Sequence, residues 1–73
     1  MEKIKMYDVV ALTEDLPETS LRRGQVGTVV LEYTQPEPAF EVEFSDINGR
    51  TYALLALRPN QLMILHHEPA EVA

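Results

Sequence analysis

The sequence predicts a single all-β domain of five short strands, and three observations carry that prediction. Residues 27–33 become apolar and β-branched directly after a polar arm, and such side chains suit a pleated, half-buried surface. Residues 40–45 alternate strictly between apolar and polar side chains, which is the period of a strand with one buried face. Asn48-Gly49 follows at once, and this dipeptide is a strong hairpin signal. We therefore expect an antiparallel sheet organised around a long, bent central strand.

The first strand is predicted at residues 6–13, where an apolar run lies between a lysine and an acidic pair. Both faces of this strand are apolar, so we expect it to be covered on both sides. A polar arm, 14–23, follows. Pro17 disfavours a helical conformation at Leu16, and we expect Leu16 and Leu21 to anchor the arm to the core. The arm is too long for a hairpin and predicts a long first loop.

The second strand is predicted at about 25–34. Gly24, just before it, permits a turn with positive φ. Gly27, inside it, predicts a bulge or a close approach of backbones. The strand is expected to end at Gln35-Pro36-Glu37-Pro38, because two prolines within three residues cannot lie in a central ladder.

The third strand, 40–45, and the fourth, 51–57, are expected to form a hairpin. A two-residue type I′ turn at Asn48-Gly49 places Ile47 opposite Arg50 and sets the register. The resulting pairs on one face are wholly apolar and predict the core: Phe44 with Ala53, Val42 with Leu55, and Phe40 with Leu57. The pairs on the other face are Ser45 with Tyr52, Glu43 with Leu54, and Glu41 with Ala56.

Residues 58–61 are predicted to form one turn of 3₁₀ helix, and 62–65 the short fifth strand. Five strands, a long first loop and a 3₁₀ turn before the last strand are typical of a small SH3-like barrel. A four-stranded sheet with a frayed end is the alternative. The domain is expected to span residues 1–65, with 66–73 as a flexible C-terminal tail.

Composition narrows the functional classes. The chain has 73 residues, no cysteine, and twelve acidic against six basic residues, a formal charge of −6. A disulfide framework and a thiolate metal cluster are excluded. The charge opposes binding to nucleic acid, which depends on clustered basic residues, and docking to anionic lipid. No stretch has the length of a membrane span or the pattern of a signal peptide, so a cytoplasmic protein is expected.

The second face of the predicted hairpin is the candidate binding site. An exposed leucine beside two carboxylates has the character of a partner site, an apolar patch rimmed by charge. In the alternative, the N-terminal segment or the tail covers Leu54, or a bulge turns the strand over. Arg22 and Arg23 could add a cationic contact or form a solvated pair with weak ion pairs. The predicted partner-binding residues are Glu41, Glu43, Tyr52, Leu54, Arg22 and Arg23.

Other chemistries find little support in the sequence. His66-His67-Glu68 could suggest a metal site, but adjacent histidines on an extended segment point to opposite sides, and no further histidine or cysteine completes a shell. No serine or threonine has a histidine nearby in sequence to activate it as a nucleophile. Glu41 and Glu43 could form a carboxylate pair, but so small a domain has no room for a water-free pocket around them. We therefore expect no catalysis, metal, cofactor or small-molecule substrate, and binding to a protein partner or self-association instead.

Two resemblances extend this prediction. The segment 24–29 (GQVGTV) resembles the glycine-containing core of KOW-type modules, which implies the alternative of a nucleic-acid- or ribosome-associated barrel. The longer strings 7–17 (YDVVALTEDLP), 23–30 (RGQVGTVV), 41–44 (EVEF) and 49–55 (GRTYALL) resemble a family of short bacterial, often cyanobacterial, proteins of unknown function. The family resemblance covers about residues 6–65 and implies an SH3-like barrel and a cytoplasmic setting. It also implies similarity in size and context to small antitoxin or immunity proteins.

Overall fold

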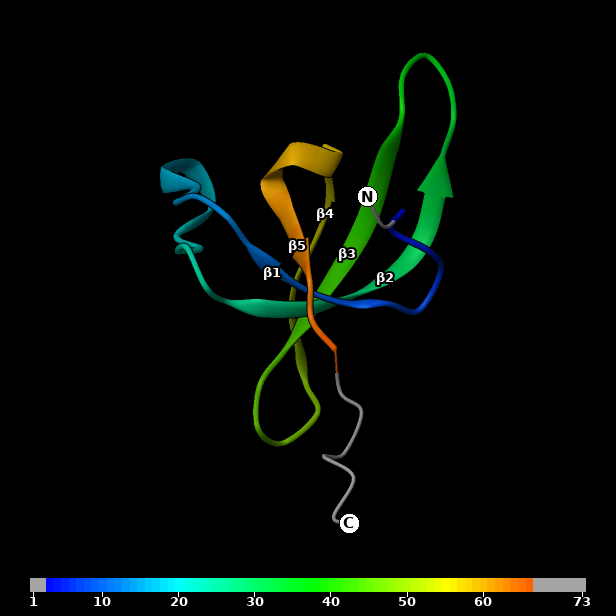
Figure 1. Ribbon diagram of the computed structural model, residues 1–73. Helices are drawn as coiled ribbons and strands as arrows, with labels where there is room; N and C mark the ends of the chain where they lie inside the picture. The colour runs from blue at the N-terminus through cyan, green and yellow to red at the C-terminus, as the bar shows by residue number, and fades with distance from the viewer. Residues whose placement is uncertain (1–2, 67–73) are drawn as a thin grey trace, which may run out of the picture.

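The computed structural model describes residues 3–66, which form one five-stranded antiparallel sheet and two short 3₁₀ turns (Figure 1). The strands are β1 (Val9–Leu12), β2 (Val26–Tyr33), β3 (Ala39–Ser45), β4 (Thr51–Leu57) and β5 (Leu62–Ile64). The 3₁₀ turns are η1 (Pro17–Thr19) and η2 (Pro59–Gln61). The predicted all-β fold, its five strands and the 3₁₀ turn before the last strand are confirmed.

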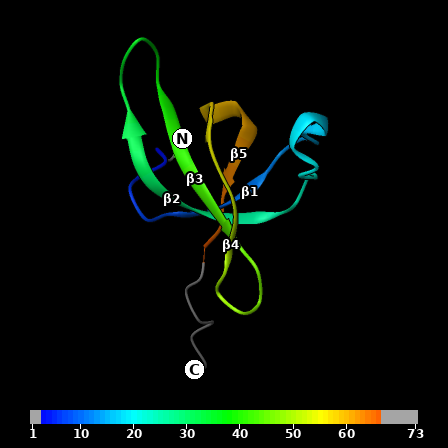
Figure 2. The same cartoon turned by 180° about the vertical axis from the view of Figure 1, so that it is seen from behind.

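The strands lie in the order β4-β3-β2-β1-β5, with β4 and β5 at the two edges. Within the described part of the chain these two edges are not hydrogen-bonded to each other, so the sheet is open. The long β2 curves strongly and carries the sheet around the core, as Figure 1 shows and Figure 2 repeats from behind. The prediction of five antiparallel strands is confirmed. Their closure into an SH3-like barrel stays a prediction.

The first strand begins later than expected. Residues 6–8 were predicted to be extended, but Tyr7 has a φ of 68°, and extended backbone requires a negative φ. A turn forms instead: the Asp8 N–H donates to the Lys5 carbonyl oxygen at 3.1 Å, and an Asp8 carboxylate oxygen accepts from the Lys5 N–H at 2.8 Å. The strand that follows is buried on both faces at Val10, Ala11 and Leu12, as expected from its sequence.

The turn between β3 and β4 differs from the predicted two-residue type. Only Gly49 has a positive φ in it, whereas a type I′ turn needs two such residues. The Asp46 N–H donates to the Arg50 carbonyl at 2.8 Å, and the Asp46 carboxylate accepts from the Asn48 and Arg50 N–H groups. The loop therefore has three residues, and Arg50 lies opposite Asp46 rather than Ile47. Ile47 points into solvent and is 99 % exposed.

A bulge in β4 corrects the extra loop residue. Ser45 pairs with Thr51 rather than with Tyr52, and the next pair is Phe44 with Ala53, so Tyr52 has no partner in the ladder. The register beyond the bulge is the predicted one. The confirmed pairs are Phe44 with Ala53, Glu43 with Leu54, Val42 with Leu55, Glu41 with Ala56, and Phe40 with Leu57.

The core lies on the concave side of the curved sheet. Its buried residues are Val10, Leu12, Leu21, Val29, Phe40, Val42, Phe44, Leu57 and Leu62, and Ile4, Leu16, Ala53 and Leu55 pack against it. The predicted inward positions of the third strand are thus confirmed. Gly27 also matches its prediction of a close approach: a Cβ atom there would lie 2.7 Å from Val42 Cγ1 and 2.9 Å from the Glu43 carbonyl oxygen.

The first loop, residues 13–25, is anchored as its sequence predicts. Leu21 is buried and Leu16 packs against the core. The two leucines pair in an isolated bridge in which the Leu16 N–H donates to the Leu21 carbonyl at 2.8 Å. Between them lies η1, a 3₁₀ turn with proline at its first position, which the sequence did not suggest. Proline suits the first position of such a turn, because an N–H group there would have no hydrogen-bond partner within the turn.

The predicted flexible tail, 66–73, lies outside the described residues except for His66. Among residues 3–66, no helix has both the length and the apolar character needed to cross a membrane.

Candidate partner-binding face

The convex side of β2, β3 and β4 carries the candidate site. Residues that pair directly in an antiparallel sheet share a face, so the register places them in rows across the three strands. One row is Thr28, Glu43 and Leu54; the next is Leu31, Glu41 and Ala56. We call these six residues the outer face. It lies opposite the inward row of Val29, Val42 and Leu55, in which the two valines are fully buried and Leu55 is partly buried.

The outer face combines apolar and acidic side chains in contact with solvent. Leu54 is 55 % exposed and Leu31 is 46 % exposed. The two glutamates, Glu41 and Glu43, are half-buried between them. In the N-terminal segment, Ile4 packs against the core. Leu54 remains more than half exposed, so residues 3–8 do not cover it. The bulge lies at Tyr52 and leaves the predicted orientation of Leu54 unchanged.

Tyr33 lies at one end of this face and holds Glu41. Its hydroxyl donates to Glu41 Oε1 at 2.9 Å. That hydrogen bond, together with desolvation and the negative charge of Glu41, raises the pKa of Tyr33 above its ordinary value of 10.0. The bond orients one of the two carboxylates and ties the end of β2 to β3.

Replacing Glu41 by glutamine is expected to lower the pKa of Tyr33 toward 10.0, because the charged acceptor is lost. Since the raised pKa means that the folded chain holds this proton more tightly than the unfolded chain, the contact's contribution to stability is complete below the ordinary tyrosine pKa. It is lost as the pH rises through the pKa of Tyr33 in the folded chain. NMR titration of the Tyr33 ring resonances measures the pKa, and urea denaturation at several pH values measures the stability. Glu43→Gln is the control, and equal Tyr33 titration in wild type and Glu41→Gln would contradict the assignment.

Tyr52 does not join the outer face in the predicted way. The bulge removes it from the ladder, and its ring packs against the core residue Phe44, with the ring centroids 6.4 Å apart. Its hydroxyl accepts a hydrogen bond from Gln25 Nε2 at 3.2 Å. Tyr52 is half-exposed, but these contacts give it a place beside the core at the hairpin end of the sheet.

Arg22 and Arg23 lie on the first loop, outside the sheet. Both are exposed, and neither forms an ion pair with another residue in the described range 3–66. Their backbone groups shape the loop: the Arg23 N–H donates to Asp15 Oδ1 at 2.9 Å, and the Arg22 N–H donates to Gln25 Oε1. The two arginines therefore form a loop pair separate from the predicted face.

Leu31 is the outer-face residue that the sequence did not predict. Strict alternation from Val29 would place Leu31 on the buried side, because residues two apart in a strand share a face. The register shifts between Val29 and Leu31, so that Val30 is an extra residue in β2. This bulge turns Leu31 outward, and no local pattern in the sequence marks it.

Side chains that could hold a metal ion do not gather here. Over residues 3–66 no group of three or more histidine or acidic side chains has the arrangement of a metal site. Of the stretch His66-His67-Glu68, only His66 lies within the described range. The chemistry that the outer face offers is apolar contact combined with charge-assisted hydrogen bonding to the two glutamates.

Comparison with known proteins places the chain in a family. No curated protein and no solved structure matches it. The family model described as a domain of unknown function (DUF4926) matches residues 6–64, which is most of the chain. This match confirms the resemblance to a family of unknown function, while the bacterial, often cyanobacterial, origin stays a prediction. The chain therefore belongs to the DUF4926 family of domains of unknown function.

Proposed function

We propose that this domain is a non-enzymatic interaction module that binds a basic protein partner through its outer face. The observation that carries the proposal is the position of Leu54. It is more than half exposed in the middle of β4 and lies directly opposite Glu43. A leucine exposed beside a carboxylate supplies both elements of an interface, apolar area to be desolvated and charge to orient the partner.

The acidic character of the face favours a partner different from the domain itself. Self-association through the outer face would bring Glu41 and Glu43 of two copies together, and closely opposed like charges destabilise a contact. A basic partner gains from the same carboxylates. The net charge of −6 adds a long-range field that speeds encounter with such a partner, most strongly at low salt.

The proposal includes the class of partner. An acidic domain of 73 residues has the size and charge to cover a basic surface on a larger protein, as an antitoxin- or immunity-like protein would. A cytoplasmic setting is part of the proposal, and the absence of cysteine is compatible with a reducing compartment.

The test is binding to the product of the gene next to the one that encodes this chain. The two proteins are first co-expressed and purified together, which tests whether they form a complex. Each is then purified alone, and one is titrated into the other by calorimetry at low and high salt. We expect Leu54→Ser to raise the dissociation constant about tenfold. Glu43→Gln is expected to slow association and to reduce its dependence on salt, because a charge of the complementary field is removed.

Ile47→Ser is the matched control, since Ile47 is an exposed apolar residue at the hairpin tip and not on the outer face. Its affinity should equal that of wild type. The proposal fails if the neighbouring product does not bind, or if Leu54→Ser binds as tightly as wild type. Retardation of nucleic acid by the domain at low salt would instead support the KOW-like alternative.

A further inference from the structure

A second surface, independent of the outer face, lies at the free edge of β4. One side of β4 pairs with β3, and the other side has no hydrogen-bonded strand beside it among residues 3–66. In an edge strand, alternate N–H and carbonyl groups point away from the sheet without a ladder partner. The opposite edge, β5, has only three residues, whereas β4 has seven.

The half of β4 that ends at Leu57 lacks the charges, prolines and bulges that usually protect edge strands. Natural edges are blunted by charged side chains, proline, bulges or short length. The sequence of β4, Thr-Tyr-Ala-Leu-Leu-Ala-Leu, contains neither charge nor proline. Its bulge lies at Tyr52, near the start of the strand, so the half that ends at Leu57 is a regular and unprotected edge.

A groove runs along this unprotected half. Its volume is about 560 Å³, and one wall is formed by β4 and the residues that follow it. The consecutive residues Leu55, Ala56 and Leu57 all line it, although side chains alternate between the two faces of a strand. A cavity that touches three consecutive residues therefore lies against the edge of the strand, where the free backbone groups are.

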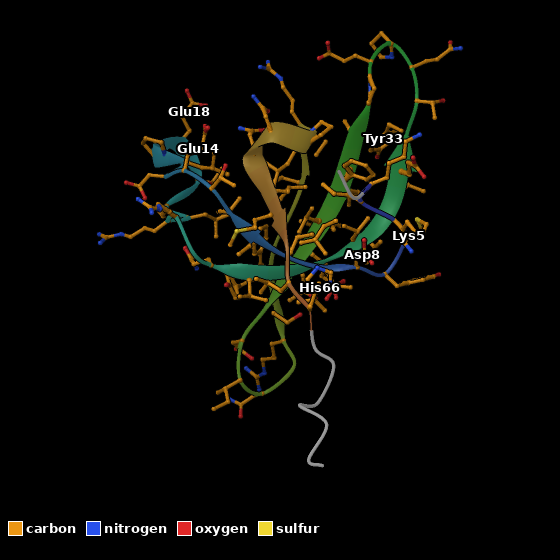
Figure 3. The ribbon with its side chains drawn as sticks, viewed as in Figure 1. Lys5, Asp8, Glu14, Glu18, Tyr33 and His66 are labelled. Carbon is orange, nitrogen blue, oxygen red and sulfur yellow. The ribbon has the colours of Figure 1, made fainter. Side chains whose placement is uncertain are left out.

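The other wall of the groove is acidic. It is formed by the first loop, which contributes Glu14, Asp15 and Glu18; Figure 3 shows Glu14 and Glu18 projecting from the part of this loop around η1. Arg58 is the basic residue that lines the groove, and its Nε lies 3.9 Å from Glu37 Oε1. Neither Glu14 nor Glu18 has a hydrogen-bond or ion-pair partner within the described range 3–66. The groove thus presents a backbone edge on one side and available carboxylates on the other.

We propose that an extended, basic segment of a partner protein adds to the sheet in this groove as a strand beside β4. Its backbone pairs with the edge of β4, its apolar side chains contact the half-buried Leu55, and its lysine or arginine side chains face the first loop. Strand addition is an established mode of peptide recognition in which main-chain hydrogen bonds give affinity and side-chain contacts give specificity. A second copy of this chain is a poorer occupant, because pairing two β4 edges would bring two acidic loops together.

The probe is a synthetic seven-residue peptide of alternating lysine and valine, with blocked termini, and its binding is measured by NMR. Among the amides of residues 54–57, we expect alternate ones to gain protection from hydrogen exchange, because only alternate amides point to the free edge. Two N-methylated versions of the peptide, blocked at even and at odd positions, should differ: one loses binding and the other keeps it. The same peptide with glutamate in place of lysine should not bind.

Paired charge variants locate the basic contact. Glu14→Gln/Glu18→Gln is expected to weaken binding about tenfold and Glu18→Gln alone about threefold, whereas Glu32→Gln removes the same single charge elsewhere and should change it less than about twofold, since distant exposed charges are screened. No saturable binding, equal effects of Glu18→Gln and Glu32→Gln, or protection of consecutive rather than alternate amides would overturn the proposal. A dimer that itself protects the β4 amides would also overturn it. Loss of binding in Leu54→Ser but not in Glu14→Gln/Glu18→Gln would assign the peptide to the outer face.

Discussion

Replacing Phe44 by alanine is expected to lower the free energy of unfolding by about 3–5 kcal/mol. Phe44 is fully buried and lies between Gly27, Ala53 and the ring of Tyr52. Because hydrogen-bonded strands flank it, the structure cannot collapse far into the space left behind. The core of a domain of this size supplies only about 3–5 kcal/mol in total, so the variant should be largely unfolded in water.

Urea denaturation followed by circular dichroism and the dispersion of amide NMR signals measure this effect. Ile47→Ala is the control, because that side chain is almost wholly in solvent, and it should change the free energy of unfolding by less than about 0.5 kcal/mol. A Phe44→Ala variant that unfolds cooperatively at the wild-type midpoint would show that the Phe44 ring is not in the core, and the assigned register of β3 would be wrong.

Replacing Gly27 by alanine is expected to cost about 1–3 kcal/mol, the usual range for overpacking a core. The added methyl group would lie 2.7 Å from Val42 Cγ1, 2.9 Å from the Glu43 carbonyl oxygen and 3.0 Å from Phe44 Cδ1. The valine could turn away, but the carbonyl belongs to the backbone of β3. We therefore expect β2 and β3 to separate locally, which the urea midpoint and the exchange rates of the β3 amides would detect.

Gly24 separates this packing effect from backbone strain. It has a φ of +91° with no atom within 4 Å of an added Cβ, so Gly24→Ala should cost about 1 kcal/mol from conformation alone. Asparagine tolerates such backbone better than alanine. Gly24→Asn should therefore be more stable than Gly24→Ala, whereas Gly27→Asn should be less stable than Gly27→Ala. The same ranking at both sites, or a wild-type midpoint for Gly27→Ala, would be inconsistent with the close approach.

The core pairs between residues 40–44 and 53–57 were derived from a two-residue turn that does not form, yet the pairs themselves are correct. Burial explains this result. Phe44 and Val42 must face apolar partners, because a register slip of one residue would expose every inward side chain. The protein therefore keeps the buried register and absorbs the three-residue loop with a bulge at Tyr52.

The sequence by itself thus determined the strand content, the buried face of the hairpin, and the pairing of Glu43 with Leu54, because each depends on neighbouring side chains and their period. Only the tertiary structure decided that Leu31 points outward and that the acidic first loop lies across a groove from β4. A bulge and the path of a long loop depend on contacts between residues distant in the chain. Such contacts leave no periodic signal in the residues that make them.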